Sequence, residues 1–174
     1  MNLANRITLL RVALIPVFLV FLYVDFTGSN YVAMGVFIAA ALTDIADGII
    51  ARKQNQVTDF GKFMDPLADK ILVVAAMLWF VEQGTLPAWT ALIVIVREFM
   101  VTALRLIAVD NGRVIAAAIS GKVKTVVTII CLSTLFVYQY TWIVYSCVGL
   151  ITATTVVSGV EYFMRNRDLL KLDK

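Results

Sequence analysis

The chain has 174 residues, of which 61% are apolar and 16% charged, and its mean hydropathy is +0.89. A typical soluble domain is about half apolar and about a quarter charged, so this composition excludes an ordinary soluble protein. The net charge of +3 comes from short basic breaks beside apolar segments, which disfavours nucleic acid as a partner. No histidine is present, which excludes histidine acid–base catalysis and histidine-containing zinc sites.

The chain begins with a segment, residues 1–11, that places Leu3, Ile7 and Leu10 on one helical face and polar residues on the others. This pattern predicts a short interfacial helix before the chain turns into the membrane. At the other end, residues 165–174 are polar and predict a cytoplasmic tail.

Six apolar stretches between these ends approach the roughly 20 residues needed to cross a bilayer. They cover residues 7–24, 31–50, 63–81, 87–109, 123–138 and 143–164. Their apolar runs are continuous rather than alternating, which favours helices over barrel strands. We therefore predict an all-α integral membrane protein with six transmembrane helices, formed by residues 1–174 as a single domain.

The basic residues lie on one side of the predicted spans. The breaks at residues 25–30, 82–86 and 139–142 contain no Lys or Arg, whereas the breaks at 51–62 and 110–122 and both chain ends are basic. Cytoplasmic segments of membrane proteins are enriched in Lys and Arg. The sequence thus predicts a multi-pass protein with both termini in the cytoplasm.

Four aspartates stand where two predicted helices meet this cytoplasmic side. Asp44 and Asp47 are three apart near the end of the second helix, and Asp65 and Asp69 are four apart at the start of the third, so each pair shares a helical face. A short break lets the two helices run antiparallel and bring the pairs together. Clustered carboxylates repel each other, and divalent cations relieve that repulsion. Ligands that are all oxygens favour Mg²⁺ or Mn²⁺ over zinc.

Neighbouring residues fit a ligand site beside these aspartates. Gly48 and Gly61 remove side chains where a flat ligand or a second backbone would approach, and Arg52 can reach an anionic substrate. The structural alternative is helix capping, with Asp65 before Pro66 as an N-cap. Asp59, outside the two pairs, is expected to be a loop residue. Capping explains a single aspartate but not two pairs with interleaved glycines.

The complete pattern, Asp44-x2-Asp47-Gly48-x2-Ala51-Arg52-x8-Gly61-x3-Asp65-x3-Asp69, matches at every fixed position the signature of the CDP-alcohol phosphotransferase family. The chain resembles this family over nearly its whole length, because its size and number of apolar stretches also agree. The resemblance implies a bacterial cell membrane enzyme with its active site on the cytoplasmic side, acting as a homodimer.

The resemblance also implies the site residues. Two Mg²⁺ or Mn²⁺ ions would be bound by Asp44, Asp47, Asp65 and Asp69, with Asp69 also the catalytic general base. CDP-diacylglycerol would be bound by Asn5, Thr8, Arg11, Asp47, Gly48, Ala51, Arg52 and Gly61.

Three further segments suggest the acceptor alcohol. The run Asn2-x2-Asn5-x2-Thr8-x2-Arg11, the segment REFMVTALR (Arg97–Arg105) and the segment GKVKT (Gly121–Thr125) resemble family members that use glycerol-3-phosphate. The implied reaction transfers the phosphatidyl group of CDP-diacylglycerol to the 1-hydroxyl of glycerol-3-phosphate. Its phosphate needs cations, for which the candidates are Arg105, Arg113, Lys122 and Lys124.

Structural roles compete for some of these cations. Arg97 could instead pair with Glu98 or Glu161, whereas Glu98, Thr102 and Arg105 are expected on one helical face. Other functions also stay open. Within the family the acceptor could be inositol phosphate or serine, and outside it the aspartates could belong to a membrane prenyltransferase or a cation transporter. The clustering of the aspartates at one membrane edge disfavours the transporter.

Overall fold

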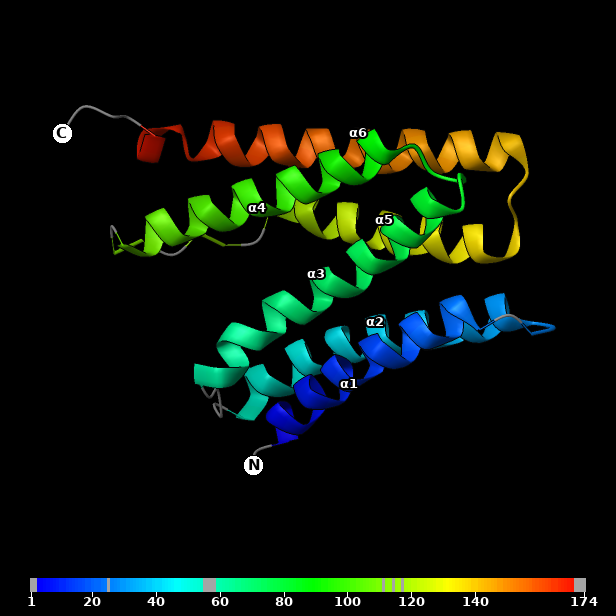
Figure 1. The fold of residues 1–174 in the computed structure, drawn as a ribbon. Helices are drawn as coiled ribbons and strands as arrows, with labels where there is room; N and C mark the ends of the chain where they lie inside the picture. Colours follow the sequence, from blue (N-terminus) through cyan, green and yellow to red (C-terminus); the bar gives the residue numbers. More distant parts are fainter. Residues whose placement is uncertain are drawn as a thin grey trace.

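The structure is a computed structural model that describes the backbone of residues 3–24, 26–54, 59–110, 112–113, 115–116 and 118–170, and within these ranges the side chains of residues 13–43 and 70–168. This part of the chain is all helical (Figure 1). The helices are α1 (Leu3–Tyr23), α2 (Ser29–Gln54), α3 (Asp59–Glu82), α4 (Ala88–Asp110), α5 (Ile119–Val137), α6 (Thr141–Arg165) and the 3-10 turn η1 (Arg167–Leu170).

Each predicted apolar stretch coincides with one α-helix, so the predicted all-α fold is confirmed. The predicted and observed helix ends differ most at the predicted break of residues 51–62, because α2 continues to Gln54 and α3 already begins at Asp59. Asp65 therefore lies in the second turn of α3 and cannot be its N-cap. The capping interpretation of Asp65 is wrong, and so is the assignment of Asp59 to a loop, because Asp59 is the first residue of α3.

The prediction of a separate interfacial helix is also wrong, because α1 runs without a break from Leu3 to Tyr23. No Gly or Pro stands between Leu3 and Ile15, so nothing in this segment interrupts helical hydrogen bonding. Pro16, the proline of α1, lies inside the helix without ending it.

The helices run up and down between two ends of the bundle (Figure 1). The connections after α1, α3 and α5 lie at one end, whereas the start of α1, the end of α6 and the connection between α4 and α5 lie at the other. α3 crosses between the α1–α2 pair and the helices α4, α5 and α6, and it contacts α1, α2, α4 and α5. The connections that lack Lys and Arg thus share one end of the fold.

An aromatic cluster fills the core toward this end. The ring of Phe136 on α5 lies 4.8 Å from Phe80 and 5.7 Å from Trp79 on α3, centroid to centroid. It also lies 6.1 Å from Phe18 on α1 and 6.0 Å from Phe37 on α2. Such ring separations are typical of favourable aromatic packing. The cluster therefore ties four helices together and leaves the opposite half of the bundle for polar groups.

The outer surface of the bundle is rich in large apolar side chains, among them Phe99, Trp142 and Tyr145. α5 and α6 are long and apolar enough to cross a membrane, and shorter apolar helical segments cover Ala13–Tyr23 and Ser29–Thr43. An apolar surface of this extent is unusual for a soluble monomer and suits contact with lipid. The fold thus indicates a helical membrane protein.

Candidate active site

The backbone of the aspartate motif lies on two helices in contact. Asp44 and Asp47 are in the second half of α2, and Asp65 and Asp69 are in the first half of α3. These halves lie toward the bundle end where α1 begins, and α2 contacts α3 (Figure 1).

The side chains of the predicted metal and CDP-diacylglycerol residues lie outside the described residues. This applies to Asn5, Thr8 and Arg11 on α1, to Asp44, Asp47, Gly48, Ala51 and Arg52 on α2, and to Gly61, Asp65 and Asp69 on α3. Among the side chains that are described, no three Asp, Glu or Cys groups are close enough together to bind a metal ion. The predicted metal site therefore stays a prediction.

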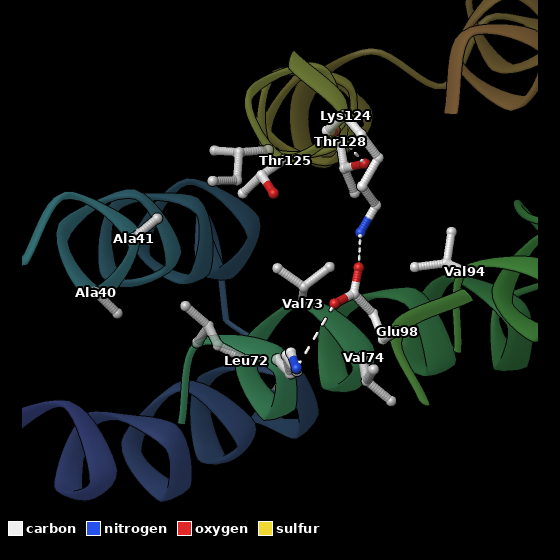
Figure 2. Close-up of a pocket in the computed structure, with 12 residues that line it drawn as sticks. Ala40, Ala41, Leu72, Val73, Val74, Val94, Glu98, Lys124, Thr125 and Thr128 are labelled. Atoms are coloured by element: carbon white, nitrogen blue, oxygen red, sulfur yellow. Dashed lines mark hydrogen bonds and ion pairs between the residues drawn. The ribbon is translucent and has the colours of Figure 1, made fainter. Parts of the chain in front are cut away.

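A cavity of about 50 Å³ is bordered by α2, α3, α4 and α5 (Figure 2). Ala40 lines it four residues before Asp44, and Val73 lines it four residues after Asp69. Positions four apart share a face of a helix. The described ends of α2 and α3 thus contribute Ala40 and Val73 to the cavity wall. The lining residues are Ala40, Ala41, Lys70, Leu72, Val73, Val74, Val94, Glu98, Lys124, Thr125, Thr128 and Ile129.

Glu98 of α4 is the centre of a charged cluster on the wall of this cavity. Its Oε1 accepts hydrogen bonds from Lys124 Nζ of α5 at 2.7 Å and from Arg97 Nη1 at 2.9 Å. Its Oε2 lies 3.8 Å from Lys70 Nζ of α3. Figure 2 shows Glu98 and Lys124 pointing toward each other across the cavity wall. Three cations thus surround one carboxylate, and the excess positive charge favours an anion nearby.

The cations of this cluster also bond to hydroxyl groups. Lys70 Nζ donates to Thr102 Oγ1 at 2.8 Å, and Arg97 Nη2 donates to Ser158 Oγ of α6 at 2.5 Å. Gly121 makes room for this arginine, since a Cβ atom there would lie 3.2 Å from Arg97 Nη2. The cluster therefore joins α3, α4, α5 and α6 around the cavity.

Tyr162 of α6 lies beside this cluster and is 2% exposed. Its ring centroid is 5.4 Å from the guanidinium carbon of Arg97 and 5.5 Å from that of Arg105. Its hydroxyl accepts hydrogen bonds from Arg105 Nη2 at 2.6 Å and from the N–H of Ala118 at 3.2 Å, and donates to the carbonyl of Ala116 at 3.5 Å. A single buried hydroxyl thus connects α4, α6 and the start of α5.

The four predicted acceptor-phosphate residues differ in their partners and exposure. Lys124 is buried against Glu98, and Arg105 is partnered by Tyr162. Arg113 forms an ion pair with Asp168, and Lys122 is exposed. Arg97 was expected to pair with Glu98 or Glu161 if its role is structural. It pairs with Glu98, whereas Glu161 pairs with Arg165 at 2.7 Å.

The sequence pattern did not indicate a role for Lys70, Ser158 or Tyr162. Thr155, Ser158 and Tyr162 stand at i, i+3 and i+7 and are all buried on α6. A polar stripe at helical spacing within an apolar segment is a signal that could have identified this face, because buried polar groups need partners.

Comparisons with known proteins agree with the motif. The family model described as CDP-alcohol phosphatidyltransferase matches residues 1–158. CDP-diacylglycerol–glycerol-3-phosphate 3-phosphatidyltransferase of Bacillus subtilis is 42% identical to this chain, covering 98% of it and 97% of the relative. The protein of the same description from Escherichia coli (strain K12) is 38% identical and covers 97% of both chains. A probable phosphatidylglycerophosphate synthase of Mycobacterium tuberculosis is 37% identical, over 94% of this chain and 81% of its own. The chain belongs to the CDP-alcohol phosphatidyltransferase family.

Proposed function

We propose that this protein transfers the phosphatidyl group of CDP-diacylglycerol to the 1-hydroxyl of glycerol-3-phosphate, releasing CMP and forming phosphatidylglycerophosphate. The observation that carries the proposal is the family's aspartate motif on two contacting helices, beside a cavity with an excess of cations. The acceptor assignment is supported by the B. subtilis and E. coli relatives, whose descriptions name glycerol-3-phosphate.

The membrane arrangement belongs to the same proposal. All six helices would span the bilayer of a bacterial cell, with both termini and the aspartate motif on the cytoplasmic side. This arrangement is supported by the grouping of the connections without Lys or Arg at one end of the bundle (Figure 1). It would let the lipid substrate stay in the bilayer while glycerol-3-phosphate enters from the cytoplasm. Two copies would form a homodimer, as the resemblance implies.

The donor set suits the divalent ions that the family implies. Asp44, Asp47, Asp65 and Asp69 supply carboxylate oxygens from the contacting helices α2 and α3. Oxygen ligands of this kind favour Mg²⁺ or Mn²⁺. Two such ions, when bound, would neutralise the pyrophosphate of CDP-diacylglycerol and the charge that develops on departing CMP.

The chain's own residues would then position and activate the substrates. Asp69 would accept the proton of the 1-hydroxyl, whose oxygen attacks the phosphorus that bears the diacylglycerol while the bond to CMP breaks. A well-placed general base contributes roughly 10²–10⁴-fold to a rate. Gly48, Ala51, Arg52 and Gly61 would line the cytidine and pyrophosphate site, and Asn5, Thr8 and Arg11 would close it from α1.

The phosphate of the acceptor would lie among the cations of α4, α5 and the connection between them, for which Arg105, Arg113, Lys122 and Lys124 are the candidates. The position of Lys124 on the cavity wall supports its inclusion. Lys70 and Arg97 reinforce the local positive charge. A phosphate there would compete with Glu98 for Lys124.

The test is CMP release by purified protein in detergent, supplied with CDP-diacylglycerol, Mg²⁺ and, in turn, glycerol-3-phosphate, inositol phosphate or serine. Turnover is expected with glycerol-3-phosphate alone. Asp69→Asn should lower the rate by roughly 10²-fold or more, whereas the control Asp59→Asn, outside the motif, should retain it.

Each other outcome has a definite meaning. Turnover with another alcohol would overturn the acceptor assignment and leave the family reaction in place. Folded protein that releases no CMP with any acceptor would overturn the enzymatic proposal. Full activity of Asp69→Asn would remove this residue from the role of general base.

A further inference from the structure

We propose that Tyr162 is a positioning residue for the acceptor phosphate, acting through Arg105 and the start of α5. The inference rests on the proposed function, and it adds a residue that the family motif does not contain. The starting observation is that its buried hydroxyl contacts Arg105, a predicted phosphate ligand, and the backbone of Ala118, just before the helix that carries Lys122 and Lys124.

The first contact orients Arg105. The guanidinium donates from Nη2 to Tyr162 Oη at 2.6 Å, and its carbon lies 5.5 Å from the centroid of the same ring. The hydrogen bond fixes the direction of one edge of the guanidinium, and the cation–π contact fixes the distance of its face from the ring. The remaining donors of Arg105, which is an exposed residue, are left for an anion.

The second contact fixes the beginning of α5. Ala118, the residue before the first turn of α5, donates its N–H to Tyr162 Oη at 3.2 Å. Lys122 and Lys124 follow within the next two turns. A shift of Ala118 would therefore move both lysines relative to Arg105.

The ring of Tyr162 also contacts the guanidinium of Arg97. Arg97 and Lys124 both donate hydrogen bonds to Glu98, so the ring is linked to Lys124 through these two residues. A polar group without a partner is costly to bury, and the three hydrogen bonds of the hydroxyl satisfy it in this buried position. Loss of the hydroxyl is expected to loosen the cations that receive the phosphate while leaving the aspartate motif on α2 and α3 untouched.

The experiment compares Tyr162→Phe with Tyr145→Phe, a matched change on the same helix at an exposed tyrosine. Steady-state CMP release is measured against glycerol-3-phosphate and, separately, against CDP-diacylglycerol. For Tyr162→Phe, KM for glycerol-3-phosphate should rise roughly 10-fold, as expected for a lost hydrogen bond to a charged group. KM for CDP-diacylglycerol and kcat should change less than about twofold, and Tyr145→Phe should resemble the unsubstituted protein.

A double substitution separates positioning from general damage. If Tyr162 acts mainly through Arg105, Tyr162→Phe combined with Arg105→Gln should raise KM little beyond Arg105→Gln alone. An unchanged KM for glycerol-3-phosphate in Tyr162→Phe would overturn the proposal, whether or not kcat falls. If Tyr162→Phe does not fold, Arg105→Gln is measured instead. An unchanged KM for glycerol-3-phosphate in Arg105→Gln would overturn the proposal, because Tyr162 is proposed to act through Arg105. Failure of the unsubstituted protein to use glycerol-3-phosphate would instead refute the proposed function.

Discussion

Lys124 Nζ lies 2.7 Å from Glu98 Oε1, and the two side chains are only 5% and 17% exposed. They belong to helices α5 and α4, and the same carboxylate oxygen also accepts from Arg97. A pair this far removed from water is stable only while both partners are present, since a lone buried charge loses its hydration without compensation. Glu98 therefore holds together a cluster that would otherwise repel itself.

Glu98→Gln is accordingly expected to destabilise the protein by about 2–4 kcal/mol, because Lys124, Arg97 and Lys70 lose their shared counter-charge. The matched control is Glu161→Gln, since the partner of Glu161, Arg165, is 69% exposed. That change should cost less than about 1 kcal/mol. Thermal unfolding in one detergent checks both, and equal effects would contradict a special role for Glu98.

Gly121 and Gly149 give a contrasting pair of Gly→Ala substitutions within helices α5 and α6. A Cβ atom at Gly121 would lie 3.2 Å from Arg97 Nη2, a group held by Ser158 and Glu98, whereas one at Gly149 would meet nothing within 4 Å. Alanine in an open helical position gains roughly 0.5–1 kcal/mol over glycine. We expect Gly149→Ala to raise the unfolding temperature and Gly121→Ala to give no such gain. A gain in Gly121→Ala as large as in Gly149→Ala would show that Arg97 is free to move.

Phe136 contacts four aromatic side chains in the core, whereas Phe99 of α4 is 72% exposed. Phe136→Ala leaves a cavity and removes packing contacts, so it should cost at least about 2 kcal/mol even in an apolar detergent environment. Phe99→Ala should change stability by less than about 0.5 kcal/mol. The comparison is made by thermal unfolding, and a similar loss in both variants would mean that the aromatic cluster does not hold the helices together.

Removal of divalent ions tests the aspartate motif independently of the acceptor. EDTA is expected to abolish CMP release, and added Mg²⁺ or Mn²⁺ in excess should restore it, because the proposed ligands are all oxygens. Asp47→Asn should raise the concentration of Mg²⁺ needed for half-maximal activity, while Asp59→Asn should leave it unchanged. Activity that persists after exhaustive chelation would refute a metal-dependent reaction.

Much of the fold could be predicted from the sequence because hydropathy and helix periodicity are local properties. The six apolar stretches coincide with α1 to α6, and Glu98 and Thr102 share a face of α4, since both contact Lys70. The exact helix ends were less predictable. α1 begins before its apolar segment and α2 continues beyond its own, because polar residues without Gly or Pro, such as those at 52–54, do not stop a helix.

The aspartate motif, its family and the one-sided distribution of basic residues were therefore determined by the sequence alone, through residue types at fixed spacing. The partners of the cations were decided only by tertiary structure. Lys124 bonds to a residue 26 positions away, Arg105 to one 57 away and Arg97 to one 61 away. Such contacts depend on how helices rotate and slide against one another, and side-chain packing along the whole length of each helix sets that register. This is the physical reason why Tyr162, an ordinary aromatic residue in an apolar segment, acquires its role only in the folded protein.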